Sequence, residues 1–141
     1  MTASARWEHF QHGADVGVRG LGPTRAQAFE QAALAMTATV ADLDLVQARD
    51  AVQIQRRCPD SEILLTEWLN AIVYEMATRH MLFSRFEVRI DGEELEGEAW
   101  GEPVEVKRHR PAVEVKGATL TQLRVAQDPD GTWVAQCVVD V

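Results

Sequence analysis

The sequence has few cysteines and no long apolar run. Its two cysteines, Cys58 and Cys137, form neither a CxxC motif nor a spacing typical of a zinc site. They indicate reduced thiols in a protein core, as expected in the cytoplasm. No stretch approaches the roughly 18 apolar residues of a membrane-spanning helix, and residues 1–11 lack the apolar region of a secretion signal. The sequence therefore predicts a cytoplasmic protein that makes no contact with a membrane.

Basic residues are scarce relative to acidic ones. The chain has 14 lysines and arginines against 22 aspartates and glutamates, which gives a formal net charge of −8 and an isoelectric point near 4.9. A protein that holds RNA or DNA by itself normally shows a basic face, so we expect this chain to meet RNA only indirectly. An acidic surface is better suited to a basic protein partner or a metal ion.

The length and composition are those of one folded domain. The chain has 141 residues, of which 46% are hydrophobic and 26% are charged. These values are ordinary for a globular domain with a single core. No internal repeat or linker interrupts the sequence, so we expect one domain over residues 1–141.

Two helices are predicted from apolar spacing and capping residues. The first begins at Thr24, because Thr24-x-x-Gln27 is a capping box in which each side chain satisfies an unpaired backbone N–H. It ends near Val40, and its narrow apolar stripe is rich in alanine, which lets the helix pack close to a sheet. The second helix follows Pro59-Asp60 and spans residues 61–79, with a broad apolar face.

The rest of the chain alternates apolar and polar residues, which is typical of strands with one buried face. The predicted strands span residues 7–10, 16–21, 51–57, 86–90, 95–100, 104–107, 113–116, 120–127 and 133–139. The inward face of the last strand consists of Trp133, Ala135, Cys137 and Val139. Strands segregated in this way, together with two helices, predict an α+β fold in which the helices pack on a mostly antiparallel sheet.

Two aspartates stand in apolar, β-branched surroundings near the two ends of the chain. Asp15 lies in the run 12–18, and Asp140 is followed only by Val141, whose α-carboxylate adds a third anion. An unpaired carboxylate is costly to bury. If the two segments pair in one sheet, the three carboxylates converge, and such an all-oxygen set suits Ca²⁺, Mg²⁺ or Mn²⁺.

A simpler interpretation needs no metal. In it Asp15 caps a turn and Asp140 lies on a frayed, solvated end, and composition alone favours this view. Asp42 and Asp44 are likewise interpreted as solvated carboxylates of a connecting loop. Asn70 lies inside the second helix, where asparagine is uncommon, and it either hydrogen-bonds a neighbouring loop or faces water.

Several runs together resemble the archease family, and the resemblance covers essentially the whole chain. The first, His12-Gly13-Ala14-Asp15-Val16-Gly17, is similar to the family's H-T-A-D-V-G run. The other similar runs, in the family's order, are Glu67-Trp68-Leu69-Asn70, Phe83-Ser84-Arg85-Phe86, Ala99-Trp100-Gly101-Glu102, Arg108-His109-x-Pro111, Val113-Glu114-Val115-Lys116 and Val139-Asp140-Val141. The combination is far more specific than any single run.

The resemblance implies an accessory activator of the GTP-dependent tRNA-splicing RNA ligase. Such a protein promotes guanylylation and multiple turnover of the ligase and is not itself an enzyme, because the ligase holds the GTP, the Mn²⁺ and the RNA. The family binds a divalent cation at positions that match Asp15, Asp140 and Val141 here. We expect Ca²⁺, with Mn²⁺ or Mg²⁺ as alternatives. A lysine that matters in the family matches Lys116.

A second set of residues is assigned to contact with the ligase or its active site. The basic segment 107–110 stands out in an acidic protein, and a solvated loop is its default interpretation. We hypothesise that this segment, with Lys116, contacts RNA phosphate or an acidic edge of the ligase. The residues assigned to this contact are Lys116, His109, Arg108, Arg110 and His12.

The chain departs from the family pattern at three positions. Gly13 stands where threonine is usual, and we expect it to loosen the turn before Asp15. Leu120 and Thr121 stand where the family often has a tyrosine and a histidine. The last two differences leave the details of partner contact open.

Two further functions are weighed against the activator. A metal-dependent hydrolase needs an open coordination position and a nearby base. The candidate bases are His9, His12 and His109, but no set with catalytic spacing is present. A general chaperone or adaptor for an RNA-modifying enzyme is the remaining alternative.

Overall fold

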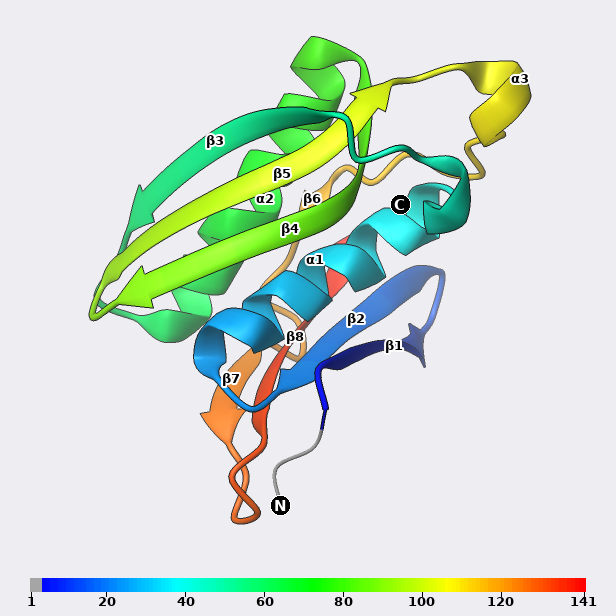
Figure 1. Cartoon of the computed structure of the whole chain (residues 1–141). Helices are drawn as coiled ribbons and strands as arrows, with labels where there is room; N and C mark the ends of the chain where they lie inside the picture. Colours follow the sequence, from blue (N-terminus) through cyan, green and yellow to red (C-terminus); the bar gives the residue numbers. More distant parts are fainter. Residues whose placement is uncertain (1–3) are drawn as a thin grey trace.

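Two antiparallel sheets enclose two long helices in the computed structural model, which describes residues 4–141 (Figure 1). The elements in chain order are β1 (Arg6–His12), β2 (Asp15–Gly22), α1 (Arg25–Val40), the 3-10 helix η1 (Leu43–Leu45), β3 (Asp50–Arg57), α2 (Ser61–Arg79), β4 (Met81–Asp91), β5 (Glu94–Pro103), α3 (Val106–His109), β6 (Gly117–Ala118), β7 (Arg124–Gln127) and β8 (Trp133–Asp140). No helix within residues 4–141 has the length and apolar character needed to span a membrane.

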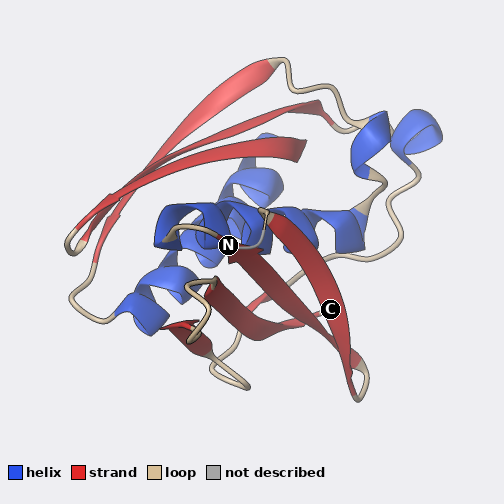
Figure 2. Ribbon diagram, turned by 60° about the horizontal axis from the view of Figure 1, so that its bottom comes forward, coloured by secondary structure: helices blue, strands red, loops and turns tan. Residues whose placement is uncertain are grey.

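The two sheets differ in size and lie on opposite sides of the helices. The larger has the order β1-β2-β8-β6, with β7 also paired to β8, and the smaller has the order β3-β5-β4. Figure 2 shows the helices as a middle layer between them. All strand pairs are antiparallel. The two sheets and the helices between them share one hydrophobic core. The predicted α+β class, with helices on antiparallel sheet, is confirmed.

Helix α1 begins where its capping box predicted. The Thr24 hydroxyl accepts a hydrogen bond from the backbone N–H of Gln27 at 3.1 Å, which satisfies one of the unpaired donors of the first turn. A methyl group added to Gly20 of β2 would lie 2.1 Å from the Ala28 carbonyl oxygen. Only a residue without a side chain allows this approach, so the expected close packing of an alanine-rich helix on a sheet is confirmed.

Helix α2 is held by its cap and by a buried tryptophan. The Asp60 carboxylate accepts from the N–H groups of Glu62 and Ile63 at 2.8 and 3.2 Å. Trp68 is fully buried and donates its indole N–H to the Phe29 carbonyl of α1 at 3.1 Å, which satisfies the one polar group of its ring. The helix ends at His80, whose φ of 54° is a left-handed conformation that stops the helical pattern.

Three predicted strands are partly or wholly wrong. Residues 104–107 and 113–116 form no ladder, and the short helix α3 stands at 106–109 instead. Of the strand predicted at 120–127, only residues 124–127 form a strand, β7. Residues 119–122 form a turn instead, in which Gln122 has a φ of 56°. Residues 43–45 are a 3-10 helix capped by Asp42 rather than an open loop. The valine-rich runs have strand propensity, but long-range contacts override it.

Strand β8 is buried on both faces. The predicted inward residues Ala135, Cys137 and Val139 are buried as expected. Their neighbours Val134, Gln136 and Val138 are buried too. One reason is that the 119–122 turn lies along the strand, where the Gln136 amide donates to the Gln122 carbonyl at 3.1 Å and the Val138 N–H donates to the Thr121 carbonyl at 3.0 Å.

The two thiols should differ sharply in reactivity. Burial raises the pKa of Cys137 to about 12, so its reactive thiolate is nearly absent near neutral pH. Cys58 is only half-buried, and the two do not form a disulfide. We expect an aromatic disulfide reagent to modify one thiol quickly in the native protein and the second only after unfolding in guanidinium. Equal rates for both thiols in the native protein would contradict the burial of Cys137.

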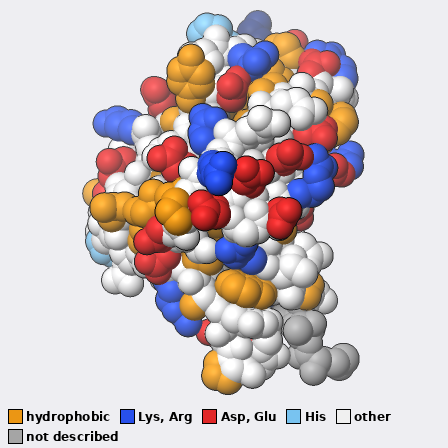
Figure 3. Space-filling model, turned by 90° about the vertical axis from the view of Figure 1, so that its left-hand side faces the viewer, with side chains coloured by type: hydrophobic (Ala, Val, Ile, Leu, Met, Phe, Trp, Pro, Cys, Tyr) orange, Lys and Arg blue, Asp and Glu red, His pale blue; other side chains and the backbone are white. Residues whose placement is uncertain are grey.

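Charges of both signs are interspersed on the side of the molecule that carries the hairpin between β4 and β5 (Figure 3). Ion pairs between neighbouring strands of this sheet include Arg57 of β3 with Glu94 of β5 at 3.4 Å and Arg89 of β4 with Glu96 of β5 at 3.1 Å. Such exposed pairs add little stability, but they leave no broad field of one sign. This face therefore has no basic patch of the kind that binds nucleic acid.

Candidate metal and partner-contact site

The turn that precedes Asp15 is a two-residue hairpin. His12 pairs with Asp15 across the end of β1 and β2, and Gly13 has a φ of 57°. Glycine adopts positive φ without steric cost, and hairpin turns of this length require it. A side chain at Gly13 would meet no neighbour, so the requirement is purely conformational. Gly13 therefore fits the turn and does not loosen it, contrary to our expectation.

The segments that carry the two aspartates are neighbours in the larger sheet. Val16 pairs with Val139, so Asp15 lies opposite Asp140 at the next step of the ladder. Residues directly opposite on antiparallel strands point to the same face. The backbone N–H of Val141 also donates to the Asp15 carboxylate, over a long 3.4 Å. The two segments therefore pair in one sheet, which is the condition under which their carboxylates were expected to converge.

Asp140 is fixed on its other side as well. Strand β6 pairs with it through Gly117, and the N–H of Lys116 donates to the Asp140 carbonyl at 2.8 Å. The interpretation of Asp140 as part of a frayed end is therefore wrong. The side chain of Asp140 is nevertheless exposed, while that of Asp15 is half-buried. This placement brings the backbone of Lys116 next to the aspartate pair.

The two aspartates are not neutralised by an ion pair within the described part of the chain. Within residues 4–141, no lysine, arginine or histidine forms an ion pair with Asp15 or Asp140. Nor does any group of three or more histidine, cysteine, aspartate or glutamate side chains in that range form a metal site. Side chains thus supply two carboxylates here, and the main chain of Val141 lies beside them. An all-oxygen set of this kind fits a hard cation with an incomplete protein shell.

Asn70 ties helix α2 to this edge of the sheet. Its side-chain oxygen accepts from the Ala118 N–H at 2.9 Å, and a methyl group on Gly117 would lie 3.1 Å from the same oxygen. Of the two interpretations of Asn70, hydrogen bonding to a neighbouring segment is confirmed. The contact fixes β6 relative to helix α2, and because β6 pairs with Asp140, it also helps to fix the position of Asp140.

The segment 104–116, which we call the strap, is anchored on a buried carboxylate. Glu102 is only 2% exposed. Arg108 donates to both of its oxygens at 2.9 and 3.0 Å, and the N–H of Gln47 donates at 2.7 Å. These charge-assisted bonds satisfy the carboxylate fully, which is the condition for burying it. The Arg108 guanidinium is the main cause that lowers the pKa of Glu102 to about 2.

His109 belongs to the same buried cluster. It is 1% exposed, its Nδ1 accepts from the N–H of Glu105 at 2.8 Å, and its Nε2 lies 3.0 Å from the Glu102 carboxylate. Because Nδ1 accepts, we assign the ring hydrogen to Nε2, which donates to Glu102. The predicted solvated loop is therefore wrong for His109, and Arg108 is engaged by Glu102 and Glu105. His109 is too deeply buried to meet a partner directly, whereas the side chain of Arg108 is still 39% exposed.

The free basic side chains are concentrated on the strap. Of the 14 lysines and arginines, ten form ion pairs within residues 4–141. Arg25 donates to Ser61 and to the Gly92 carbonyl. The remaining three, Lys107, Arg110 and Lys116, have no such partner in that range and are exposed. Two of these three, Arg110 and Lys116, were assigned to partner contact from the sequence.

The three candidate bases do not converge. His9 points to the helix side of the sheet, where its Nε2 lies 2.7 Å from the Ala35 carbonyl oxygen. His12 is three positions further along β1 and therefore on the opposite face, beside Asp15. His109 is enclosed in the Glu102 cluster. Only His12, which is exposed, lies near the aspartate pair.

Glu102 is the residue of this region that the sequence did not reveal. It shares one face of β5 with Glu96 and Glu98, which are exposed and half-buried. Strand alternation alone therefore places Glu102 outside. It is buried because the strap folds back over this end of the strand and brings Arg108 and His109 against it. Only the run Ala99-Trp100-Gly101-Glu102 drew attention to it.

The Glu102 cluster should make stability fall in acid. The folded-state pKa of about 2 lies below the ordinary value of 4.5, so the carboxylate adds stability above pH 4.5 that is lost as the pH falls toward 2. We expect the melting temperature of the wild type to drop between pH 5 and pH 2.5 by more than that of Glu102→Gln. Parallel pH profiles for the two proteins would show that Glu102 is not the group involved.

The comparisons with known proteins agree with this architecture. The profile of the Archease protein family (MTH1598/TM1083) matches residues 7–141. The archease of Pyrococcus furiosus is 34% identical over 140 residues, covering 96% of this chain and 99% of that protein. The archease of Thermococcus gammatolerans is 36% identical over 140 residues, with the same two coverages.

Two solved structures show a similar fold. The solution structure of protein 1598 from Methanobacterium thermoautotrophicum has a TM-score of 0.82 and 32% identity, covering 96% of this chain and 98% of its own. An archease from Thermotoga maritima, described as a "possible chaperone", has a TM-score of 0.63 and 15% identity, covering 95% and 96%. The second supports the fold alone. By profile, by sequence and by fold, the chain belongs to the archease family.

Proposed function

We propose that this protein is an accessory activator of the GTP-dependent tRNA-splicing RNA ligase in the cytoplasm. In this role it promotes guanylylation and multiple turnover of the ligase and is not itself an enzyme. The observation that carries the proposal is the pairing of β2 with β8, which places Asp15 opposite Asp140 with Lys116 at the next strand. These are the positions to which the resemblance of the sequence runs assigns the cation and the lysine of the family.

The proposed metal ligands are Asp15, Asp140 and the carboxylate of Val141. A bound Ca²⁺, Mn²⁺ or Mg²⁺ would supply positive charge at this edge of the sheet. The long bond from the Val141 N–H to Asp15 holds the main chain close to the side chain that would share the cation. Because Ca²⁺ prefers roughly 6–8 oxygen ligands, water or the partner has to complete the shell. Binding by the protein alone should therefore be weak.

The proposed partner contacts are His12, Arg110 and Lys116. His12 lies beside Asp15, and Lys116 lies beside Asp140 through its backbone. Arg108 and His109 act indirectly, since their bonds to Glu102 hold the strap on which Arg110 is carried. Free cations on an acidic protein favour contact with a partner's acidic groups or with phosphate. RNA is met only through the ligase.

Reconstitution with the cognate ligase separates the activator from its alternatives. The ligase is incubated with GTP and Mn²⁺, and covalent guanylylation is followed with and without an equimolar amount of this protein. A faster and more complete reaction supports the activator, and an unrelated chaperone should not replace it. A general chaperone would be replaceable in this assay. Hydrolysis of phosphate esters by this chain alone would favour the metal-dependent hydrolase, with His12 as its base.

A further inference from the structure

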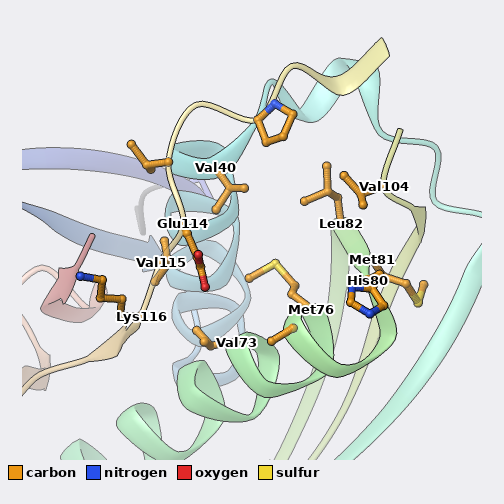
Figure 4. Close-up of a pocket in the computed structure, with 13 residues that line it drawn as sticks. Val40, Val73, Met76, His80, Met81, Leu82, Val104, Glu114, Val115 and Lys116 are labelled. Carbon is orange, nitrogen blue, oxygen red and sulfur yellow. The ribbon is translucent and has the colours of Figure 1, made fainter. Parts of the chain in front are cut away.

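A large apolar cavity lies between the ends of the two long helices and the strap. Its volume is about 590 Å³, and its walls come from α1, α2, the start of β4 and residues 104–116 (Figure 4). The apolar lining includes Val73, Met76, Leu82, Val104, Val113 and Val115. The cavity opens to solvent, because Ala77, Val113 and Lys116 of its lining are exposed. Open, mostly apolar clefts of this size are typical of binding sites.

The strap cannot collapse into the cavity, because three backbone bonds fix it. The Val104 N–H donates to the His80 carbonyl at 2.9 Å, the Ala112 N–H to the Val40 carbonyl at 2.8 Å, and the Lys116 N–H to the Asp140 carbonyl at 2.8 Å. The Glu102 cluster adds a fourth anchor at the centre of this segment. The cavity is therefore a preformed feature of the fold.

The rim of the cavity is charged, and Lys116 connects it to the aspartate pair. Lys116 lines the cavity with its side chain while its backbone bonds Asp140. In Figure 4 its ammonium group points away from the centre of the cavity, so the aliphatic stem forms the wall. Lys107 and Arg110, which like Lys116 have no ion pair within residues 4–141, lie on the same strap outside the lining, and Glu114 is the one carboxylate in the lining. The unpaired cations of the strap thus outnumber this carboxylate. An occupant that carries carboxylates beside apolar groups would complement this arrangement.

Nucleic acid fits these walls poorly. Single strands bind to proteins mainly by stacking their bases on aromatic side chains beside basic grooves. The lining consists mainly of valines and methionines, with a leucine, an alanine, a proline, Glu114 and Lys116, and His80 is its one aromatic ring among the described residues. Methionine is flexible and suits a surface that adapts to another protein's side chains. The lining thus favours a protein segment over RNA.

We propose that the cavity is the anchor site for an acidic, amphipathic segment of the protein partner. The proposal rests on the proposed function, since it names the part of the ligase that this protein holds. A cavity of about 150 Å³ accommodates a benzene ring, so this one has room for roughly three large side chains. They would enter in the i, i+3, i+4 pattern of a helix laid in a groove. Carboxylates flanking them would pair with Lys107, Arg110 and Lys116.

Filling the cavity should weaken ligase binding without harming the fold. Val113→Trp and Ala77→Trp place an indole in the cavity from opposite walls, and both positions are exposed in the free protein. The matched control is Gln53→Trp, on the exposed side of β3 and away from the cavity. Affinity for the cognate ligase is measured by calorimetry, and folding by thermal melting. We expect a loss of at least about tenfold for each cavity variant, as for anchor residues of protein interfaces, and none for the control.

A charge-reversal pair tests the rim separately. Lys107→Glu combined with Arg110→Glu should weaken the same affinity and reduce its dependence on salt, whereas Arg89→Glu on β4 should not. If the charge reversal weakens binding but both cavity variants bind normally, the contact is purely electrostatic and the cavity proposal is wrong. If the cavity variants bind and activate like the wild type, the proposal is overturned while the activator function stands. If the wild type itself neither binds nor activates the ligase, the activator function fails and the proposal falls with it.

Discussion

Asp15→Asn and Asp140→Asn should each fold normally and lose most of the activation of the ligase. Asparagine keeps the shape and one oxygen of the side chain but removes the charge that a hard cation prefers. We expect the ligase guanylylation rate at equimolar protein to fall on the order of 100-fold below that with the wild type, an effect of the size caused by weakening a metal site. The rate is measured with GTP and Mn²⁺ under single-turnover conditions.

The stability of the same variants shows whether the aspartates are structural. Asp15 lies opposite Asp140 with no cationic partner in residues 4–141. Removing one of two neighbouring anions relieves repulsion, so the metal-free melting temperature should stay level or rise. A fall of about 10 °C, which corresponds to 2 kcal/mol or more for a domain of this size, would make them structural. Asp91→Asn, at the exposed end of β4, is the matched control.

Glu102→Gln should produce the largest loss of stability among single polar substitutions in this chain. The glutamine is similar in shape, but it removes the buried charge that Arg108 binds and leaves Arg108 only the exposed Glu105 as a counter-ion. It also places an N–H₂ group next to N–H donors that are bound by a carboxylate oxygen in the wild type. Because Arg108 is 39% exposed, the pair is only partly buried, and we expect a loss below that of a fully buried ion pair, on the order of 1–3 kcal/mol. Urea denaturation should show a lower midpoint with an unchanged slope. Limited proteolysis should show new cleavage within 104–116.

Glu105→Gln is the matched control for Glu102→Gln. Glu105 also binds Arg108, but its side chain is 61% exposed. An exposed ion pair contributes less than about 1 kcal/mol, so the denaturation midpoint should barely change. Equal losses for the two variants would mean that the buried cluster does not anchor the strap and that the cavity behind it is not preformed.

The helices could be predicted from the sequence because their signals are local. The capping box at Thr24 and the cap at Asp60 each act within three residues, and both helices begin there. The apolar spacing of α2 needed no distant partner to be interpreted. Most strands were predicted for the same reason, since alternation is a property of the strand itself.

The strap could not be predicted, because its partners are distant in the sequence. Its valines alternate as a strand would, but its backbone N–H groups at Val104, Ala112 and Lys116 bond carbonyls at His80, Val40 and Asp140. No local pattern encodes these pairings. His109 was expected in solvent because the segment around it is basic, and its burial depends on Glu102, seven residues earlier and itself expected outside.

The aspartate pair could be predicted only in part: the two residues stood out in the sequence, but their arrangement in space did not. Asp15 and Asp140 stood out by their apolar surroundings, and the pairing of β2 with β8 brings them together. The sequence alone does not determine that β2 and β8 are neighbours, nor their register, which must be correct to the residue for the two carboxylates to share a face. The role of Asn70 in holding β6 beside them was left open for the same reason.

Calorimetric titration with Ca²⁺ and with Mn²⁺ tests the central claim most directly. The wild type should bind one ion weakly, because the protein offers only three carboxylates and the cation prefers roughly 6–8 oxygens. Asp15→Asn, Asp140→Asn and a C-terminal extension that converts the Val141 carboxylate to an amide should each abolish or strongly weaken the binding. Asp42→Asn, on η1, should bind like the wild type. Undiminished binding by both Asp15→Asn and Asp140→Asn would place the cation elsewhere and contradict the site.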